Sequence, residues 1–148
     1  MTDDPNRNNA LIPYDPNRVE EESRATHGTL PVKIRFHLLD TGDVVEMPAN
    51  QPILIGRRGS GTRVDLDLTE FQGRDRGISR KHVLIEPSGN RVMIKDLESV
   101  NGTRLNRQRL KPLFVYELSN GDLLQIGDLL VKIHFIHLQG LQSGLNNG

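Results

Sequence analysis

Gly56-Arg57-Arg58-Gly59-Ser60-Gly61-Thr62 opens a stretch that ends at Asn101-Gly102-Thr103 and has Ser79-Arg80-Lys81-His82 in its middle. Each cluster belongs to a polar, glycine-bearing segment between short apolar runs. Such segments are typical of the loops that join β-strands. We therefore expect three loops that converge at one end of a β-sandwich and hold a phosphate there.

The apolar runs around these loops alternate with polar residues at a period of two, as half-buried strands do. Val32, Ile34, Phe36 and Leu38, for example, fall on one face. Strands are expected at 32–38, 44–47, 52–55, 64–68, 82–86 and 92–97, around Leu105 and Leu110, and at 114–118, 123–126 and 129–136. No run shows the apolar period of a helix, so about eleven short strands indicate an all-β sandwich or barrel.

Composition divides the 148 residues into one domain and two tails. Only 35% of the residues are hydrophobic and 4% aromatic, which is lean for the full length. Residues 1–29 carry six acidic and three basic residues, and their only apolar patch is Leu11-Ile12-Pro13-Tyr14, so we expect a disordered acidic tail. The domain is expected at 30–137, followed by a flexible tail at 138–148.

Charge and residue content argue against several functional classes. The chain has 19 basic and 19 acidic residues, so neither nucleic acid nor a membrane is expected as a partner. It has no Cys, which excludes disulfides, thiolate metal sites and Cys nucleophiles. There is no secretory signal and no run of the ~20 apolar residues that a membrane span needs. We expect a soluble cytoplasmic protein without a metal or cofactor.

The first two clusters carry groups suited to an anion. Arg57 follows a strand end directly, so the strand aims its planar fork of donors; the alternative is an ordinary solvated arginine. Ser79 offers a hydroxyl beside a backbone amide, and Arg80 adds charge. His82 is expected to be buried and to pin its loop by bonding to the backbone. Residues 56–82 hold seven basic and four acidic residues, which makes this region locally positive.

Asn101 in the third cluster carries both a donor and an acceptor. Its amide can pair with the N–H and the C=O of an extended peptide. The alternative is a turn, since Asn-Gly between strands is a common hairpin signal that needs no ligand. Each cluster taken alone is compatible with a plain surface loop, and their combination is more specific.

In this order and at this spacing the clusters resemble the signature of the forkhead-associated (FHA) family. The matching residues are Gly56-Arg57, then Ser79-Arg80-Lys81-His82, then Asn101-Gly102-Thr103, with Asn106 at a further family position. The resemblance covers nearly all of residues 31–137. It implies an FHA/SMAD-like β-sandwich of two antiparallel sheets that binds phosphothreonine peptides.

The resemblance also implies roles for single residues. Arg57 and Ser79 would bind the phosphate of a phosphothreonine, Arg80 would assist, and Asn101 would hold the ligand backbone. The loops would be shaped by Gly56, His82, Gly102 and Thr103. Secondary contacts would come from Arg58, Ser99, Val100 and Arg76.

Two positions depart from the family pattern. Val100 stands where a Thr or Ser hydroxyl often lies near the phosphate, so that contact is missing or passes to Ser99. Gly77 stands at a position that often selects the third residue after the phosphothreonine, so no charge preference carries over. The loop 69–78, with Arg74 and Arg76, would then set selectivity.

Enzymatic alternatives fit the residues less well, and no catalytic residue is assigned. Gly56-x4-Gly61-Thr62 matches a P-loop only in part, because Thr62 replaces the lysine and no helix follows. Ser79, His82 and Asp96 could be drawn as a triad, but no nucleophile elbow surrounds the serine.

Metal and nucleic-acid binding are also disfavoured. His134 and His137 are three residues apart near a strand end and so point to opposite faces, which is poor for a metal site. Nucleic-acid binding through residues 56–82 would need exposed aromatic residues or a broad basic face. The four Phe lie mostly in strand patterns, and there are only two Tyr.

The partner implied by the resemblance is a Thr-phosphorylated protein, either a Ser/Thr kinase or a kinase substrate, recruited by an adaptor. The alternative is an FHA-like scaffold for phosphate-independent protein–protein interaction. A further hypothesis concerns Thr2, Thr26 and Thr29, any of which, once phosphorylated, would bind the positive loops of its own or another copy. Closing a loop of some 30 residues costs only a few kcal/mol, so a switch within one chain is physically allowed.

Overall fold

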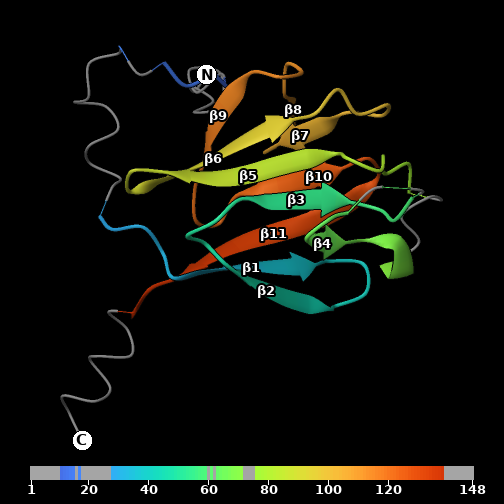
Figure 1. Cartoon of the computed structure of the whole chain (residues 1–148), viewed down its shortest axis with the longest axis horizontal. Coiled ribbons are helices and arrows are strands. Elements are labelled where there is room, and N and C mark those ends of the chain that lie inside the picture. Colours follow the sequence, from blue (N-terminus) through green and yellow to red (C-terminus); the bar gives the residue numbers. More distant parts are fainter. Residues whose placement is uncertain are drawn as a thin grey trace, which may run out of the picture.

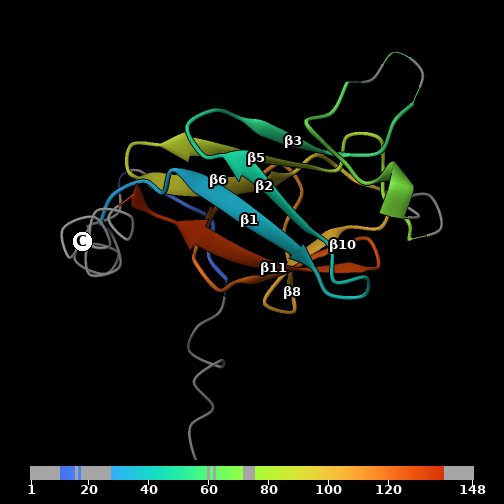
Figure 2. The same cartoon turned by 90° about the horizontal axis from the view of Figure 1, so that it is seen from below.

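The computed structural model describes residues 11–15, 17, 28–59, 61, 63–71 and 76–138. Within these ranges the chain forms eleven strands in two packed sheets, which confirms the predicted β-sandwich (Figures 1 and 2). The strands are β1 (Lys33–Leu38), β2 (Val44–Pro48), β3 (Ile53–Gly56), β4 (Leu66–Asp67), β5 (Val83–Ser88), β6 (Arg91–Asp96), β7 (Thr103–Leu105), β8 (Gln108–Arg109), β9 (Val115–Leu118), β10 (Leu123–Ile126) and β11 (Leu129–Ile136).

One sheet has six strands in the order β2-β1-β11-β10-β7-β8, and the other has five in the order β4-β3-β5-β6-β9. Neighbouring strands pair antiparallel except β3 and β4, which pair in parallel over two residues. The strand expected at 64–68 is thus shorter than predicted, and a 3-10 turn at Thr69–Phe71 follows it.

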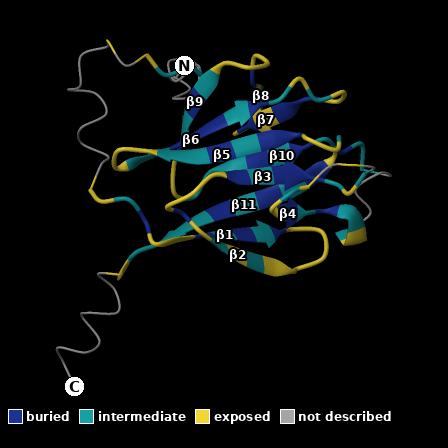
Figure 3. Cartoon of the chain, viewed as in Figure 1, coloured by how far each residue is buried: buried dark blue, intermediate teal, exposed yellow. Residues whose placement is uncertain are grey.

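The core lies between the inner faces of the two sheets, where Figure 3 shows the buried residues. Phe36 and Leu38 from β1 are fully buried against residues such as Ile55 of β3 and Ile85 of β5. Val32 was expected to share the inner face of β1, but it precedes the strand and its side chain is 40% exposed.

The sandwich has two distinct ends. The segments after β3, before β5 and between β6 and β7 meet at one end, on the right in Figure 1. We call this the site end. The β5–β6 turn lies at the opposite end, where the amide of Asn90 donates to the carbonyl of Gly28 at 3.0 Å.

Part of the predicted acidic tail contacts the domain. The Leu11 amide donates to the Gln108 side chain at 2.7 Å, and the Tyr14 amide donates to the Val115 carbonyl at 2.5 Å. The Arg91 guanidinium lies 5.2 Å from the centre of the Tyr14 ring. The apolar patch of the tail therefore lies along β8 and β9, the adjoining edge strands of the two sheets. The disorder predicted for 1–10, 16 and 18–27, and the flexible tail predicted at 139–148, lie outside the described residues.

Candidate functional site

The first two loops at the site end touch through their backbones. A Cβ atom on Gly56 would lie 1.9 Å from the carbonyl oxygen of Arg80, so only glycine allows this approach. The amide of Arg57 donates to the carbonyl of Ser79 at 3.3 Å. Gly56 thus fixes the distance between the loops that carry Arg57 and Ser79.

The guanidinium of Arg57 is held along one edge. Its Nε donates to the carbonyl of Ile78 at 2.8 Å, and one terminal nitrogen lies 3.5 Å from the carbonyl of Arg58. Among the described residues no acidic side chain pairs with Arg57. The side chain is therefore a half-buried cation, oriented by the second loop and without a counter-charge in the described part of the chain.

Ser79 joins the second loop to the third. Its Oγ accepts a hydrogen bond from the amide of Val100 at 3.0 Å, and its own amide donates to Nδ1 of His82 at 3.0 Å. Because the hydroxyl oxygen acts as an acceptor, its proton is available to donate to a ligand.

His82 is fully buried and linked to the backbone on both sides. Since Nδ1 accepts from Ser79, the proton is on Nε2, which donates to the carbonyl of Gly102 at 2.9 Å. Burial lowers the pKa of His82, and the Gly102 bond and the charge of Asp96 offset this only in part. Both ring nitrogens are therefore occupied, and Ser79, His82 and Asp96 do not form a catalytic relay.

Asp96 organises the third loop, a role that the sequence analysis missed. Its carboxylate is 1% exposed and accepts from the hydroxyls of Ser99 and Thr103, each at 2.6 Å, and from the Ser99 amide at 3.2 Å. The Ser99 hydroxyl also accepts from the Gly102 amide at 3.0 Å. The sequence signal for this role is an acidic residue at the end of a strand, three residues before a serine that can donate its hydroxyl to it.

These bonds change the expectation for Ser99. Its hydroxyl is turned inward onto Asp96, so it supports the loop instead of replacing the missing hydroxyl at Val100. The Val100 side chain is 82% exposed beside Ser79. Thr103 is fully buried, and its hydroxyl donates to Asp96 at 2.6 Å.

Asn101 links the third loop to the second through a side-chain hydrogen bond. Its Nδ2 donates to the carbonyl of Gly77 at 3.0 Å, and a Cβ on Gly77 would lie 2.5 Å from that nitrogen. Gly77 also has a φ of +73°, which glycine adopts readily. A shallow depression of ≈ 380 Å³ beside Asn101 is lined by Gly77, Arg76, Gly127 and Asp128.

The three remaining arginines of the predicted set lie in different places. The Arg80 side chain lies against Gly59 in the first loop, where a Cβ would be 2.4 Å from its Nε. Arg76 lines the depression beside Asn101, but its charge is paired with Asp40. Arg80 therefore lies close to the loop that carries Arg57, and Arg76 is already neutralised.

Arg58 turns to β4 instead of to the other loops. It forms an ion pair with Asp67 at 2.7 Å and approaches Glu70 at 3.8 Å, and its amide is bonded to Thr69. Burial raises the pKa of Asp67, but hydrogen bonds from Thr69 and the charge of Arg58 outweigh it, so the pKa is lowered. The predicted secondary contact from Arg58 thus competes with an existing ion pair.

The described residues include no group of three or more His, Cys, Asp or Glu side chains arranged to hold a metal ion. In the same ranges, no helix is long and apolar enough to cross a membrane. The site is instead a set of three cross-linked loops that present Arg57, the Ser79 hydroxyl and the Asn101 amide.

A family model for the FHA domain matches residues 53–127. The chain belongs to the FHA domain family. An FHA domain-containing protein of Arabidopsis thaliana is 33% identical over 96 residues, which cover 64% of this chain and 23% of that protein. The chain thus matches less than a quarter of the length of this relative.

Two solved structures share the fold. The solution structure of an FHA domain from a hypothetical protein of Arabidopsis thaliana has a TM-score of 0.61 at 28% identity and covers 74% of this chain and 90% of that one. A structure from a study of phosphothreonine-dependent FHA domain interactions has a TM-score of 0.55 at 26% identity and covers 70% of this chain and 96% of that one.

Proposed function

We propose that this FHA domain binds a phosphothreonine segment of a partner protein through the three loops at the site end. The observation that carries the proposal is the guanidinium of Arg57, which has no acidic partner among the described residues and is held by the carbonyl of Ile78, the residue before Ser79. Membership in the FHA family and similarity to an FHA domain studied for phosphothreonine-dependent interactions support it.

The phosphate would lie between the first two loops. A phosphothreonine carries a charge of about −1.5 to −2 at neutral pH and three acceptor oxygens. Arg57 supplies donors already aimed by the second loop, Ser79 donates its hydroxyl proton, and Arg80 adds positive charge from the same region. Since the loops are already cross-linked, little ordering entropy opposes binding.

Asn101 would align the peptide next to the phosphate. One of its amide protons is used on the Gly77 carbonyl, which leaves the second proton and Oδ1 for the N–H and C=O of an extended ligand. We infer an adaptor without catalysis of its own that recruits Thr-phosphorylated kinases or kinase substrates in the cytoplasm.

Thr29 is a poor candidate for a ligand that folds back on its own domain. Its neighbour Gly28 is bonded to Asn90 at the end of the sandwich opposite the phosphate loops. Thr2 and Thr26 lie outside the described residues. We therefore keep the hypothesis of binding within one chain for these two, and that of binding to another copy for all three threonines.

The test is a titration with a Thr-phosphorylated peptide pool and its unphosphorylated twin. We expect Arg57→Ala to weaken phosphopeptide binding at least about 100-fold, since a charge-assisted bidentate contact is lost. Lys81→Ala is the matched control, because Lys81 is exposed in the same region and has no assigned role. Thermal unfolding should change little in either variant.

Two results would contradict the proposal. Equal affinity for the phosphorylated and unphosphorylated peptides would favour the phosphate-independent scaffold. A large loss of thermal stability in Arg57→Ala would show that this arginine mainly supports the fold.

A further inference from the structure

The outer face of the six-stranded sheet is strongly cationic, although the chain has no net charge. The inward positions of its strands, such as Phe36 and Val131, are buried, so the alternate positions face outward. The outward positions of its strands include five cations and one acid. The cations are Lys33, Arg35, Lys132, Arg104 and Arg109, and the acid is Glu46.

These five cations form a diagonal band, which we call the cationic stripe. Arg109 and Arg104 are cross-strand partners at the β8 edge. Lys132 lies opposite Leu123 of β10 on one side and His37 of β1 on the other, and Arg35 and Lys33 follow along β1 toward the opposite end. From strand spacing and rise per residue, the stripe is roughly 25–30 Å long, about eight residues of extended peptide.

Much of this charge is uncompensated. Glu46 pairs with Arg35 at 2.8 Å and approaches Lys33 at 3.7 Å. Among the described residues, Arg104, Arg109 and Lys132 form no ion pair. Burial raises the pKa of Asp122, and the charge of the nearby Lys132 partly opposes this rise.

The stripe begins beside the third loop of the site. A Cβ on Gly102 would lie 2.7 Å from Cζ of Arg109, so the guanidinium rests against Gly102. Gly102 directly follows Asn101, which would hold the ligand backbone. A ligand that leaves the site on this side therefore meets Arg109 first and then Arg104.

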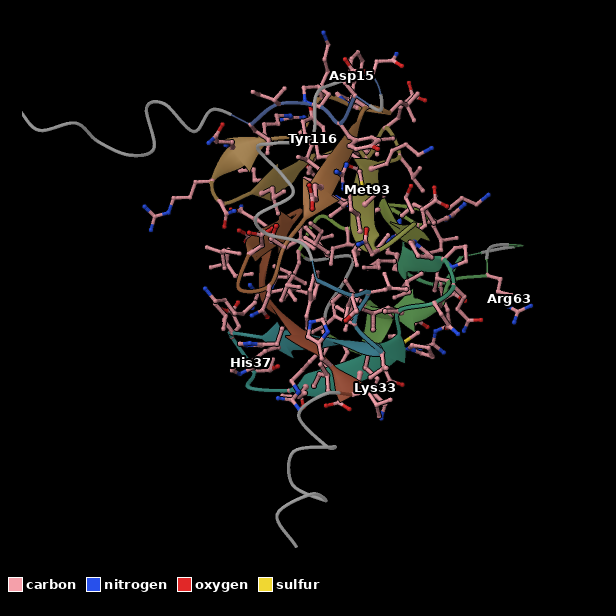
Figure 4. The ribbon with its side chains drawn as sticks, turned by 90° about the vertical axis from the view of Figure 1, so that its left-hand side faces the viewer. Asp15, Lys33, His37, Arg63, Met93 and Tyr116 are labelled. Carbon is pink, nitrogen blue, oxygen red and sulfur yellow. The ribbon has the colours of Figure 1, made fainter. Side chains whose placement is uncertain are left out.

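The opposite sheet has a different character. Its outward strand positions include Asp67, Glu86 and Glu117 against Arg91 and Lys95. Positive charge is thus concentrated on one outer face, the one continuous with the third loop. Figure 4 shows His37 at the lower left of the molecule and Lys33 at its lower edge, with Arg63 at the right.

On the basis of the proposed function, we propose that the cationic stripe binds an acidic segment adjoining the phosphothreonine of the same partner. Charge complementarity and continuity with the third loop support this occupant. The outward strand positions of this face carry no Phe, Tyr or Trp, and their only rings are the imidazoles of His37 and His134. A single-stranded nucleic acid, which binds largely by stacking on aromatic platforms, is therefore less favoured than an acidic peptide. Recognition is then bipartite, with the phosphate fixing the register and the acidic segment adding affinity.

The experiment extends a pool of phosphothreonine peptides with neutral flanks by six Glu residues at either end, with six Gln as the control. We expect the Glu extension at one end to tighten binding to the full chain about ten-fold at low salt, and this gain to shrink in high salt. Arg104→Gln combined with Lys132→Gln should remove the gain and leave the affinity for the unextended pool within about two-fold.

Lys95→Gln, on the outer face of the other sheet, should keep the gain in full. No gain from Glu at either end, or a gain that survives the double substitution, would overturn the inference. So would a short oligonucleotide that binds through Arg104 and Lys132 when the acidic peptide does not. If the unextended pool binds no better than its unphosphorylated twin, the proposed function itself fails, which is a separate result.

Discussion

The two ends of the sandwich differ in how their turns are held. At the site end, separate loops bond to one another, as Ser79 does to Val100 and His82 to Gly102. At the opposite end, the turn between β5 and β6 is closed mainly by its own hairpin, at the pairing of Ser88 with Arg91, and its Asn90 side chain also donates to the Gly28 carbonyl. Cross-linked loops can hold donors in fixed positions for a ligand, whereas a hairpin turn only reverses the chain.

The opposite end nevertheless has the larger hollow. A pocket of ≈ 470 Å³ lies there, against ≈ 380 Å³ beside Asn101. The lining of the larger pocket includes both Arg91 and Glu117, whose charges are opposite, whereas Arg57 has no acidic partner within the described ranges. Under the proposed function, the phosphate therefore binds away from the larger pocket, where donors are held in position and have no acidic partner among the described residues.

The largest expected effect comes from the carboxylates that hold a turn at each end. Asp96→Ala leaves the Ser99 and Thr103 hydroxyls without their acceptor, so the free energy of unfolding should fall by about 3 kcal/mol and phosphopeptide binding should weaken at least ten-fold. Asp122, which accepts from Asn106 and from the Ser119 amide, is the matched residue at the opposite end.

Asp122→Ala should also destabilise the domain but leave phosphopeptide affinity unchanged. Urea unfolding and peptide titration on both variants separate the two outcomes. Equal loss of binding in both would show that affinity follows global stability, and the distinction between the ends would then be wrong.

A smaller effect is expected from two glycines of similar backbone conformation. Gly77 has a φ of +73° at the site end and Gly89 a φ of +63° in the β5–β6 turn. Alanine at either position should cost about 1 kcal/mol of stability, because L-residues disfavour this region. Only the Cβ at position 77 meets a neighbour, the Asn101 amide at 2.5 Å; position 89 has nothing within 4 Å.

Gly77→Ala should therefore weaken phosphopeptide binding about ten-fold, by displacing the Asn101 amide, and Gly89→Ala should not. Peptide titration at matched fractions of folded protein measures this. Unchanged affinity in Gly77→Ala would show that Asn101 does not align the ligand.

Much of the fold could be predicted from the sequence, because apolar alternation and turn residues are local signals. The period of β1, with Phe36 and Leu38 inward, is one case. Strand order and the parallel β3–β4 pair depend on contacts between distant segments and have no local signal.

The site was predicted less completely for the same reason. Arg57, Ser79 and Asn101 could be selected by residue type and motif order, and the structure brings their loops together. The role of Asp96 and the inward hydroxyl of Ser99 depend on which way side chains turn once the loop is folded. Residue type alone cannot decide between a hydroxyl that faces a ligand and one that bonds to a buried carboxylate.

The smallest effect expected is a pH dependence that originates at the site end. Burial lowers the pKa of His82 below its usual value, although the Gly102 bond and the charge of Asp96 act in the other direction. Below about pH 6.5 the imidazole takes up a proton in the unfolded chain but not in the folded domain. As the pH is lowered from there to the pKa of the folded domain, the free energy of unfolding should therefore decrease, by at most about 1.4 kcal/mol per pH unit.

Urea unfolding at several pH values between about 7.5 and 5.5 should show this slope in the wild type, and His82→Gln should reduce it. Direct NMR titration of the imidazole gives a second measure that does not depend on the variant folding. Protonation of Nδ1 would also abolish its bond from the Ser79 amide, so phosphopeptide binding should weaken over the same range as the folded domain titrates. An imidazole that titrates at or above its usual pKa would contradict the neutral, backbone-bonded His82, and with it the account of how the loops at this end are held together.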